Sequence, residues 1–172
     1  MKSAYITVVG NLPVSFDMEQ TRKLGPVIAS ANANRSMTYD YATVNTETNL
    51  QDMLNSANFR GTELLVPEKL FKKYVFFDGV NCLPEFPGLK SYDIDPDKCS
   101  PQTLALMLAV YLRQTMVFLV GYDISNPVEL TRLKSIAIAN PNTKFMYICN
   151  PPRTYQLDDL ANGFCDTFIK FQ

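Results

Sequence analysis

Residues 100–121 read SPQTLALMLAVYLRQTMVFLVG, a helix signal followed directly by a strand signal. Ser100 is a favoured N-cap residue, and Pro101 suits the first helical position. The segment 104–112 is apolar nearly all round, which is typical of a buried helix. The apolar run 116–120 then ends at a glycine, as buried strands of parallel sheets commonly do. A buried helix followed by a buried strand predicts a parallel α/β sheet.

The remainder of the chain repeats this alternation of short strands and helices. The opening run 4–9 is β-branched and apolar and ends at Gly10. Asp17 predicts the N-cap of a helix that ends near Gly25-Pro26, where glycine and proline both favour termination. Further strands are expected at 27–30, 41–44, 63–66, 74–77 and 145–149, with a short edge strand at 168–169, and further helices are expected from Thr48, at 68–72, from Asn126 and at 158–161.

This order predicts a single Rossmann-like three-layer α/β/α sandwich with a mostly parallel sheet. The length of 172 residues fits one nucleotide-binding-like domain over residues 1–172. The proline-containing stretch 78–98 lacks periodicity and is predicted as an irregular loop, either a lid or a wrapping of the core.

Composition excludes several classes of protein. The net charge is −1 and no segment is strongly basic, so a nucleic-acid partner is not expected. No apolar run approaches the roughly 20 residues of a membrane span, and the N-terminus lacks a signal-peptide pattern, which predicts a cytoplasmic protein. The four cysteines form no C-x-x-C pair and the chain has no histidine, so no metal site is expected.

Polar residues follow the predicted strands, where ligands bind in open α/β sheets. A glycine after the first strand lets a ligand approach the backbone, and amides donate to phosphate or ribose oxygens. The alternative is that asparagine simply favours turns. Neither G-x-G-x-x-G nor G-x-x-x-x-G-K-[ST] is present, which disfavours NAD and ATP by the familiar motifs. The residues concerned are Gly10 and Asn11, Asn32 and Asn34, Asn45, Tyr122 and Asp123, and Asn150.

Three segments together resemble bacterial sialyltransferases that use CMP-sialic acid. The run 6–15 resembles the family's first strand and G-N-G-P-S-L loop, with Leu12 in place of a glycine. The run 100–103, its apolar helix and the strand ending in Gly-Tyr-Asp resemble the family's helix start and G-x-D strand end, although a glycine is missing. Residues 149–151 resemble a C-P-N type turn.

The resemblance implies a nucleotide-sugar donor, with CMP-sugar favoured, and no other cofactor. It implies binding of the nucleotide by residues at the strand ends and at the start of the 100–112 helix. These residues are Gly10, Asn11, Asn32, Asn34, Asn45, Ser100, Thr103 and Asn150.

The family's general base is a histidine, which this chain lacks. Asp123 or Asp93 is a carboxylate alternative, although such residues often cap turns. Tyr122 or Tyr92 is a proton donor toward a leaving phosphate, although buried tyrosines usually pack. Asp123 and Tyr122 are the predicted catalytic pair.

Two hypotheses follow from these residues. The first is a small glycosyltransferase-like enzyme that transfers a sugar from a nucleotide donor. The second is a non-catalytic nucleotide-binding or assembly module with a degenerate sialyltransferase-like fold. An unrelated α/β protein is the remaining alternative, because fold alone does not determine function. The oligomeric state is open, with a homo-oligomer as one option.

Overall fold

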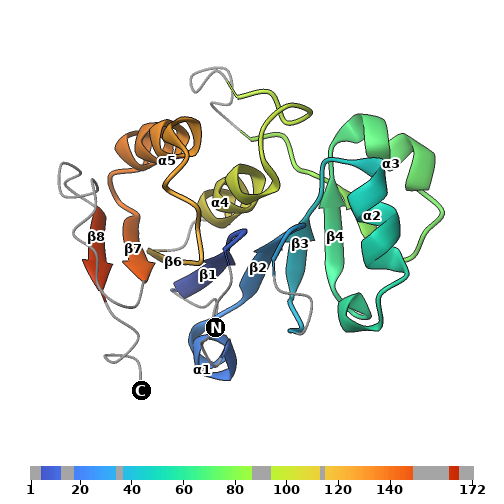
Figure 1. Cartoon of the computed structure of the whole chain (residues 1–172), viewed down its shortest axis with the longest axis horizontal. Helices are drawn as coiled ribbons and strands as arrows, with labels where there is room; N and C mark the ends of the chain where they lie inside the picture. Colours follow the sequence, from blue (N-terminus) through green and yellow to red (C-terminus); the bar gives the residue numbers. More distant parts are fainter. Residues whose placement is uncertain are drawn as a thin grey trace.

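The computed structural model describes residues 5–12, 18–33, 37–86, 94–112, 115–148 and 163–166. The strands within these residues form one sheet, in the order β5-β4-β3-β2-β1-β6-β7-β8. Every neighbouring pair of strands is parallel. Helices lie on both faces of this sheet (Figure 1). The predicted α/β class with a parallel sheet is therefore confirmed.

The strand order reverses between β1 and β6, which lie side by side at the middle of the sheet. The chain first builds outward from β1 to β5, then returns to pair β6 with β1 and builds outward to β8. The strands are β1 (Tyr5–Val9), β2 (Val27–Ser30), β3 (Tyr41–Thr43), β4 (Glu63–Val66), β5 (Val80–Cys82), β6 (Met116–Val120), β7 (Lys144–Ile148) and β8 (Gly163–Asp166). Such a reversal is the usual ligand position in open α/β sheets.

The reversal of strand order also determines on which face of the sheet each helix lies. Right-handed crossovers in opposite directions place their helices on opposite sides of a sheet. Accordingly α4 (Pro101–Tyr111) and α5 (Pro127–Ala139) lie together on one face, whereas α1 (Met18–Leu24) lies on the other (Figure 1). That other face also carries α2 (Glu47–Leu54), the short 3₁₀ helix η1 (Ala57–Phe59) and α3 (Glu68–Tyr74).

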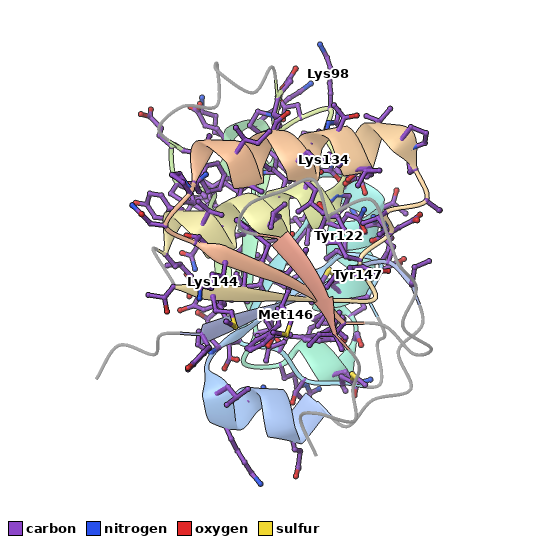
Figure 2. All side chains as sticks on the ribbon, turned by 90° about the vertical axis from the view of Figure 1, so that its left-hand side faces the viewer. Lys98, Tyr122, Lys134, Lys144, Met146 and Tyr147 are labelled. Carbon is purple, nitrogen blue, oxygen red and sulfur yellow. The ribbon has the colours of Figure 1, made fainter. Side chains whose placement is uncertain are left out.

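Two hydrophobic cores result, one on each face of the sheet. The alternation of side chains along a strand divides β7 between them: Tyr147 packs with α4 and α5, whereas Met146 packs on the opposite face (Figure 2). The helix α4 is buried from Pro101 to Ala109 and contacts β1, β2 and β3. It is the buried helix that the apolar segment predicts.

The predicted helix starts at Ser100 and Asn126 are confirmed. The Ser100 hydroxyl accepts from the Thr103 N–H, and the Asn126 side chain accepts from the Val128 N–H. In both helices proline occupies the following position, where no N–H is needed. The helix α1 ends at Leu24, directly before the predicted Gly25-Pro26 stop.

The structure differs from the sequence prediction around residues 74–82. The predicted strand 74–77 is wrong: Tyr74 is the last residue of α3, because Leu70 and Tyr74 lie one helical turn apart and both are buried. A turn with Gly79 at a φ of 78° then leads into β5, which occupies 80–82 within the predicted loop 78–98. The strand β8 was not predicted. The predicted Asp17 cap, the 158–161 helix and the 168–169 strand lie outside the described residues.

Over the described residues, no helix has the length and apolar character needed to cross a bilayer. The same part of the chain holds no group of three or more His, Cys, Asp or Glu side chains placed to bind a metal. Cys99 is a buried free thiol, and burial raises its pKa to about 12.

The central position of α4 gives a stability prediction. Leu106 is fully buried in the core between α4, α5 and the sheet. Leu106→Ala should lower the free energy of unfolding by about 2–5 kcal/mol, because it removes packed methyl groups and leaves a cavity. Urea unfolding followed by circular dichroism measures this change. The matched control is Ile138→Ala, at a residue of α5 that is 69% exposed. This substitution should change the free energy of unfolding by less than about 0.5 kcal/mol.

Candidate site at the carboxyl edge of the sheet

The segments that follow β1 and β6 lie against each other at the strand reversal. The Gly10 N–H donates to the Val120 carbonyl at 2.9 Å, and the Leu12 N–H donates to the Gly121 carbonyl at 2.9 Å. A Cβ on Gly10 would lie 2.5 Å from the Tyr122 Cα. The missing side chain of Gly10 therefore accommodates the chain's own backbone at the position where a ligand usually approaches.

The first turn of α4 contacts a buried carboxylate from α5. Glu129 is only 5% exposed, and its Oε2 accepts from the Ser100 hydroxyl at 2.5 Å and from the Thr103 hydroxyl at 2.7 Å. The same oxygen accepts from Gln102 Nε2 at 3.2 Å, and Oε1 accepts from Arg132 at 2.9 Å. An anion at a helix N-terminus is favourable, because backbone N–H groups and the helix dipole carry partial positive charge there. The protein thus supplies its own anion at the start of α4.

Glu129 was not among the residues predicted from the sequence. Its only local signal is that an acidic residue in the first turn of a helix is favourable, which applies equally to a solvent-exposed residue. The contact with Ser100 and Thr103 comes from the packing of α5 against α4, which joins residues more than 25 positions apart. A buried carboxylate needs such donors, since burial of an unpaired charge is strongly unfavourable.

Gln102 connects this cluster to the segment after β6. Its Nε2 donates to the Asp123 carbonyl at 3.1 Å, and its Oε1 accepts from the Asp123 N–H at 3.1 Å. The carboxylate of Asp123 itself accepts from the Ser125 N–H at 3.0 Å and from the Ser125 hydroxyl at 2.6 Å. Asp123 therefore stabilises a turn, the alternative that aspartate after a strand always allows.

Tyr122 is fully buried under the same cluster, and Figure 2 shows it between the sheet and α5, close to Tyr147. Its carbonyl accepts from the Tyr147 hydroxyl at 3.1 Å. Its own hydroxyl makes no hydrogen bond of good geometry among the described residues, although the nearby Thr103 hydroxyl interacts with it weakly and lowers its pKa. Burial raises the pKa of Tyr122, and the negative charge of Glu129 acts in the same direction. The phenol is therefore neutral and shielded from solvent.

Asn11, Asn32 and Asn45 lie at the carboxyl edge of the sheet, and two of these three side chains bind other residues of the chain. Asn11 Oδ1 accepts from the Ser30 hydroxyl at 2.7 Å, and Asn45 Nδ2 donates to the Cys99 carbonyl. Asn32 is exposed in the turn after β2. Asn34, Asn150, Tyr92 and Asp93 lie outside the described residues.

The sheet thus brings those predicted residues that the structure describes to one edge, but most of their polar groups contact other residues of the chain. Ser100 and Thr103 share the Glu129 carboxylate, and Asn45 contacts the residue that precedes Ser100. The Thr43 hydroxyl adds a further link at the same place, donating to the Pro101 carbonyl at 2.7 Å. Chemically, this is a network that fixes the start of α4 relative to β3 and β6.

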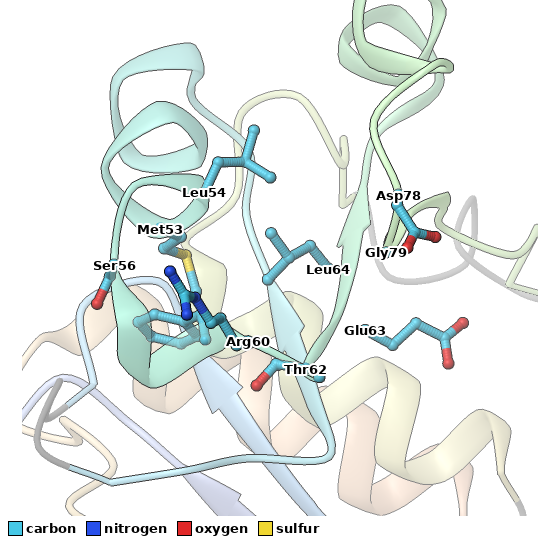
Figure 3. Close-up of a pocket in the computed structure, with 11 residues that line it drawn as sticks. Met53, Leu54, Ser56, Arg60, Thr62, Glu63, Leu64, Asp78 and Gly79 are labelled. Carbon is cyan, nitrogen blue, oxygen red and sulfur yellow. The ribbon is translucent and has the colours of Figure 1, made fainter.

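Hollows lined by described residues lie around β4 and β5. One of about 380 Å³ opens at the amino end of β4, with Met53, Leu54 and Arg60 on one side and Glu63 and Asp78 on the other (Figure 3). A second, of about 610 Å³, adjoins it along β5 and shares Glu63, Asp78 and Gly79. A third, of about 520 Å³, lies at the carboxyl ends of β4 and β5, and its lining includes Lys69, Lys72, Cys82 and Phe86.

Comparison with known proteins does not identify a family for this chain. No protein-family model matches this chain, and no curated protein sequence is significantly similar to it. The fold and the contacts described above are therefore the basis for a functional proposal.

The hydroxyls of Tyr122 and Tyr147 differ in their hydrogen bonding, and this difference predicts different effects on stability when each hydroxyl is removed. Tyr122→Phe should leave the free energy of unfolding unchanged or raise it by up to about 1 kcal/mol, because it removes a buried hydroxyl that makes no hydrogen bond of good geometry. Tyr147→Phe is the matched control and should lose about 0.5–1.5 kcal/mol, because its hydroxyl bonds to the Tyr122 carbonyl. Chemical denaturation of both variants measures the difference. A loss at Tyr122→Phe as large as that at Tyr147→Phe would contradict this description.

Proposed function

We propose the second hypothesis in its assembly form: this chain is a non-catalytic assembly module with a degenerate sialyltransferase-like fold, and its own side chains occupy the position of a nucleotide. The observation that carries the proposal is the Glu129 carboxylate at the start of α4, bonded to the hydroxyls of Ser100 and Thr103. The resemblance to sialyltransferases implies that these groups bind the ribose and phosphate of a nucleotide donor. In this chain they already bind an internal anion.

The energetic consequence is large for a phosphate ligand at this position. The ligand would have to displace Glu129 from Ser100, Gln102 and Thr103, and each hydrogen bond to a charged group contributes about 1.5–3 kcal/mol. It would also bring a second negative charge close to a buried carboxylate. Since about 1.4 kcal/mol corresponds to a tenfold change in affinity, the loss amounts to several powers of ten.

The predicted catalytic residues support the same proposal. Tyr122 is fully buried and contacts no solvent, and the Asp123 carboxylate is engaged with Ser125. The chain contains no histidine to serve as general base. General acid–base catalysis requires a group that reaches the substrate, and the burial of Tyr122 and the bonds of Asp123 to Ser125 weigh against these two residues.

The second candidate function is that of a glycosyltransferase-like protein that binds a nucleotide-sugar, with CMP-sugar favoured. Its supporting observation is the reversal of strand order between β1 and β6, the position where open α/β sheets bind nucleotides. Within the described part of the chain, Asn32 after the neighbouring strand β2 is a predicted amide that is exposed at this edge. This function would require Glu129 to move away from α4.

A thermal-shift titration with CMP, CMP-sialic acid, UDP and GDP distinguishes the two candidates. The non-catalytic proposal predicts no stabilisation of the wild-type protein by any of these nucleotides at millimolar concentration. A ligand present at 100 times its dissociation constant would add about 2.7 kcal/mol, which is readily measured.

Stabilisation by cytidine nucleotides alone, lost in Asn32→Ala, would instead establish a donor site and contradict the proposal. Asn142→Ala is the matched control, because Asn142 is also exposed but precedes β7 at the opposite edge of the sheet. A loss of binding in both variants would indicate a general effect of the substitutions rather than recognition by Asn32.

A further inference from the structure

The turn between α3 and β5 exposes three consecutive apolar side chains. Val75 is 46% exposed, Phe76 is 96% exposed and Phe77 is 51% exposed. Tyr74 anchors the turn from inside, with its ring 5.3 Å from that of Phe77. Contiguous apolar side chains at a protein surface usually mark an interaction site, because their hydration is unfavourable.

These side chains border the hollow of about 610 Å³ along β5. The strand β5 ends the sheet on this side and pairs only with β4, so its outer backbone groups face away from the described sheet. In the register with β4, both backbone groups of Val80 point to the outer edge; its N–H donates to the Phe77 carbonyl, and its carbonyl faces the edge. Open edge strands accept an added extended segment through backbone hydrogen bonds.

The ionisable residues that line this hollow are both acidic. Glu63 accepts from Asn81 Nδ2 at 3.1 Å, and neither Glu63 nor Asp78 forms an ion pair within the described part of the chain. Figure 3 shows the two carboxylates on the same side of β4, away from Arg60. The surface therefore combines exposed phenylalanine rings with negative charge, and both attract a cation.

We propose that this β5-edge surface, formed by Glu63, Val75, Phe76, Phe77, Asp78 and Val80, binds an extended peptide segment that carries a lysine or arginine between apolar residues. The apolar side chains of the segment cover Phe76 and Phe77. Its cation reaches Glu63 and Asp78. Its backbone adds to the edge of β5.

The charge of the surface favours this occupant over two others. A two-fold dimer through the same surface would bring its carboxylates close to their own copies, which is unfavourable. A bilayer with anionic headgroups would be repelled by Glu63 and Asp78, and the nearby cations Lys72 and Lys73 are already paired with Glu68 and Glu47.

This inference does not depend on the proposed function. The β5-edge surface lies at the amino ends of β4 and β5, whereas Glu129 and the start of α4 lie at the carboxyl edge. An absent nucleotide response and an absent peptide response are therefore separate results.

The test is selection of displayed random seven-residue peptides against the whole chain. Wild-type protein should enrich peptides with Lys or Arg between apolar residues. Binding of a synthetic selected peptide, measured by fluorescence anisotropy, should weaken at least about tenfold in Phe76→Ser and in the double variant Glu63→Gln/Asp78→Asn. Ile138→Ser, at an exposed apolar residue of α5, is the matched control and should bind as the wild type does.

Three kinds of result would overturn the inference. One is a failed peptide selection, in which no peptide binds in a way that depends on Phe76 or acidic peptides are enriched. Another is a wild-type dimer in light scattering that becomes monomeric in Phe76→Ser, which would assign the surface to a second copy. The third is Phe76-dependent binding to vesicles of anionic lipid, which would assign it to a membrane.

Discussion

The buried carboxylate of Glu129 holds the first turn of α4, and much of the carboxyl edge depends on that contact. Through Ser100 and Thr103 it fixes where α4 begins, and through Gln102 the same turn holds the segment after β6. The helix then contacts three strands of the sheet. A partly desolvated ion with a full set of donors is directional, so it fixes the position of α4 more sharply than apolar packing does.

This arrangement changes how the strand reversal at the middle of the sheet can be used. In nucleotide-binding sheets the glycine after the first strand, the neighbouring helix N-terminus and the open crevice cooperate to bind a phosphate. Here Gly10 accommodates the backbone of Tyr122, and the helix N-terminus binds Glu129. The parallel sheet has the strand reversal at which open α/β sheets bind ligands, while Gly10, Ser100 and Thr103 are engaged by other parts of the chain. The exposed apolar turn of Val75, Phe76 and Phe77 lies at the amino ends of β4 and β5, which is the opposite edge of the sheet.

Much of the fold could be predicted from residues 100–121, because a capped apolar helix followed by an apolar strand has few alternatives. The turn after α3 could not be predicted from the sequence. Residues 74–77 have the composition of a strand, but the spacing of Leu70 and Tyr74 buries one face of a helix instead. At the candidate site, the strand pattern predicted that Asn11, Asn32 and Asn45 follow strands, and the structure places these three at the carboxyl edge. Their partners, and the role of Glu129, depend on contacts between distant segments and carry no local pattern.

The most direct measurement is a double-mutant cycle between Glu129 and Thr103, using Glu129→Gln, Thr103→Val and their combination. The Thr103 hydroxyl donates to Glu129 Oε2 at 2.7 Å, and both side chains are buried. Chemical denaturation of the four proteins should give a coupling energy of at least about 1.5 kcal/mol, as expected for a buried hydrogen bond to a charged group. Effects that add to within about 0.5 kcal/mol would mean that Glu129 does not hold the start of α4, and would contradict the account.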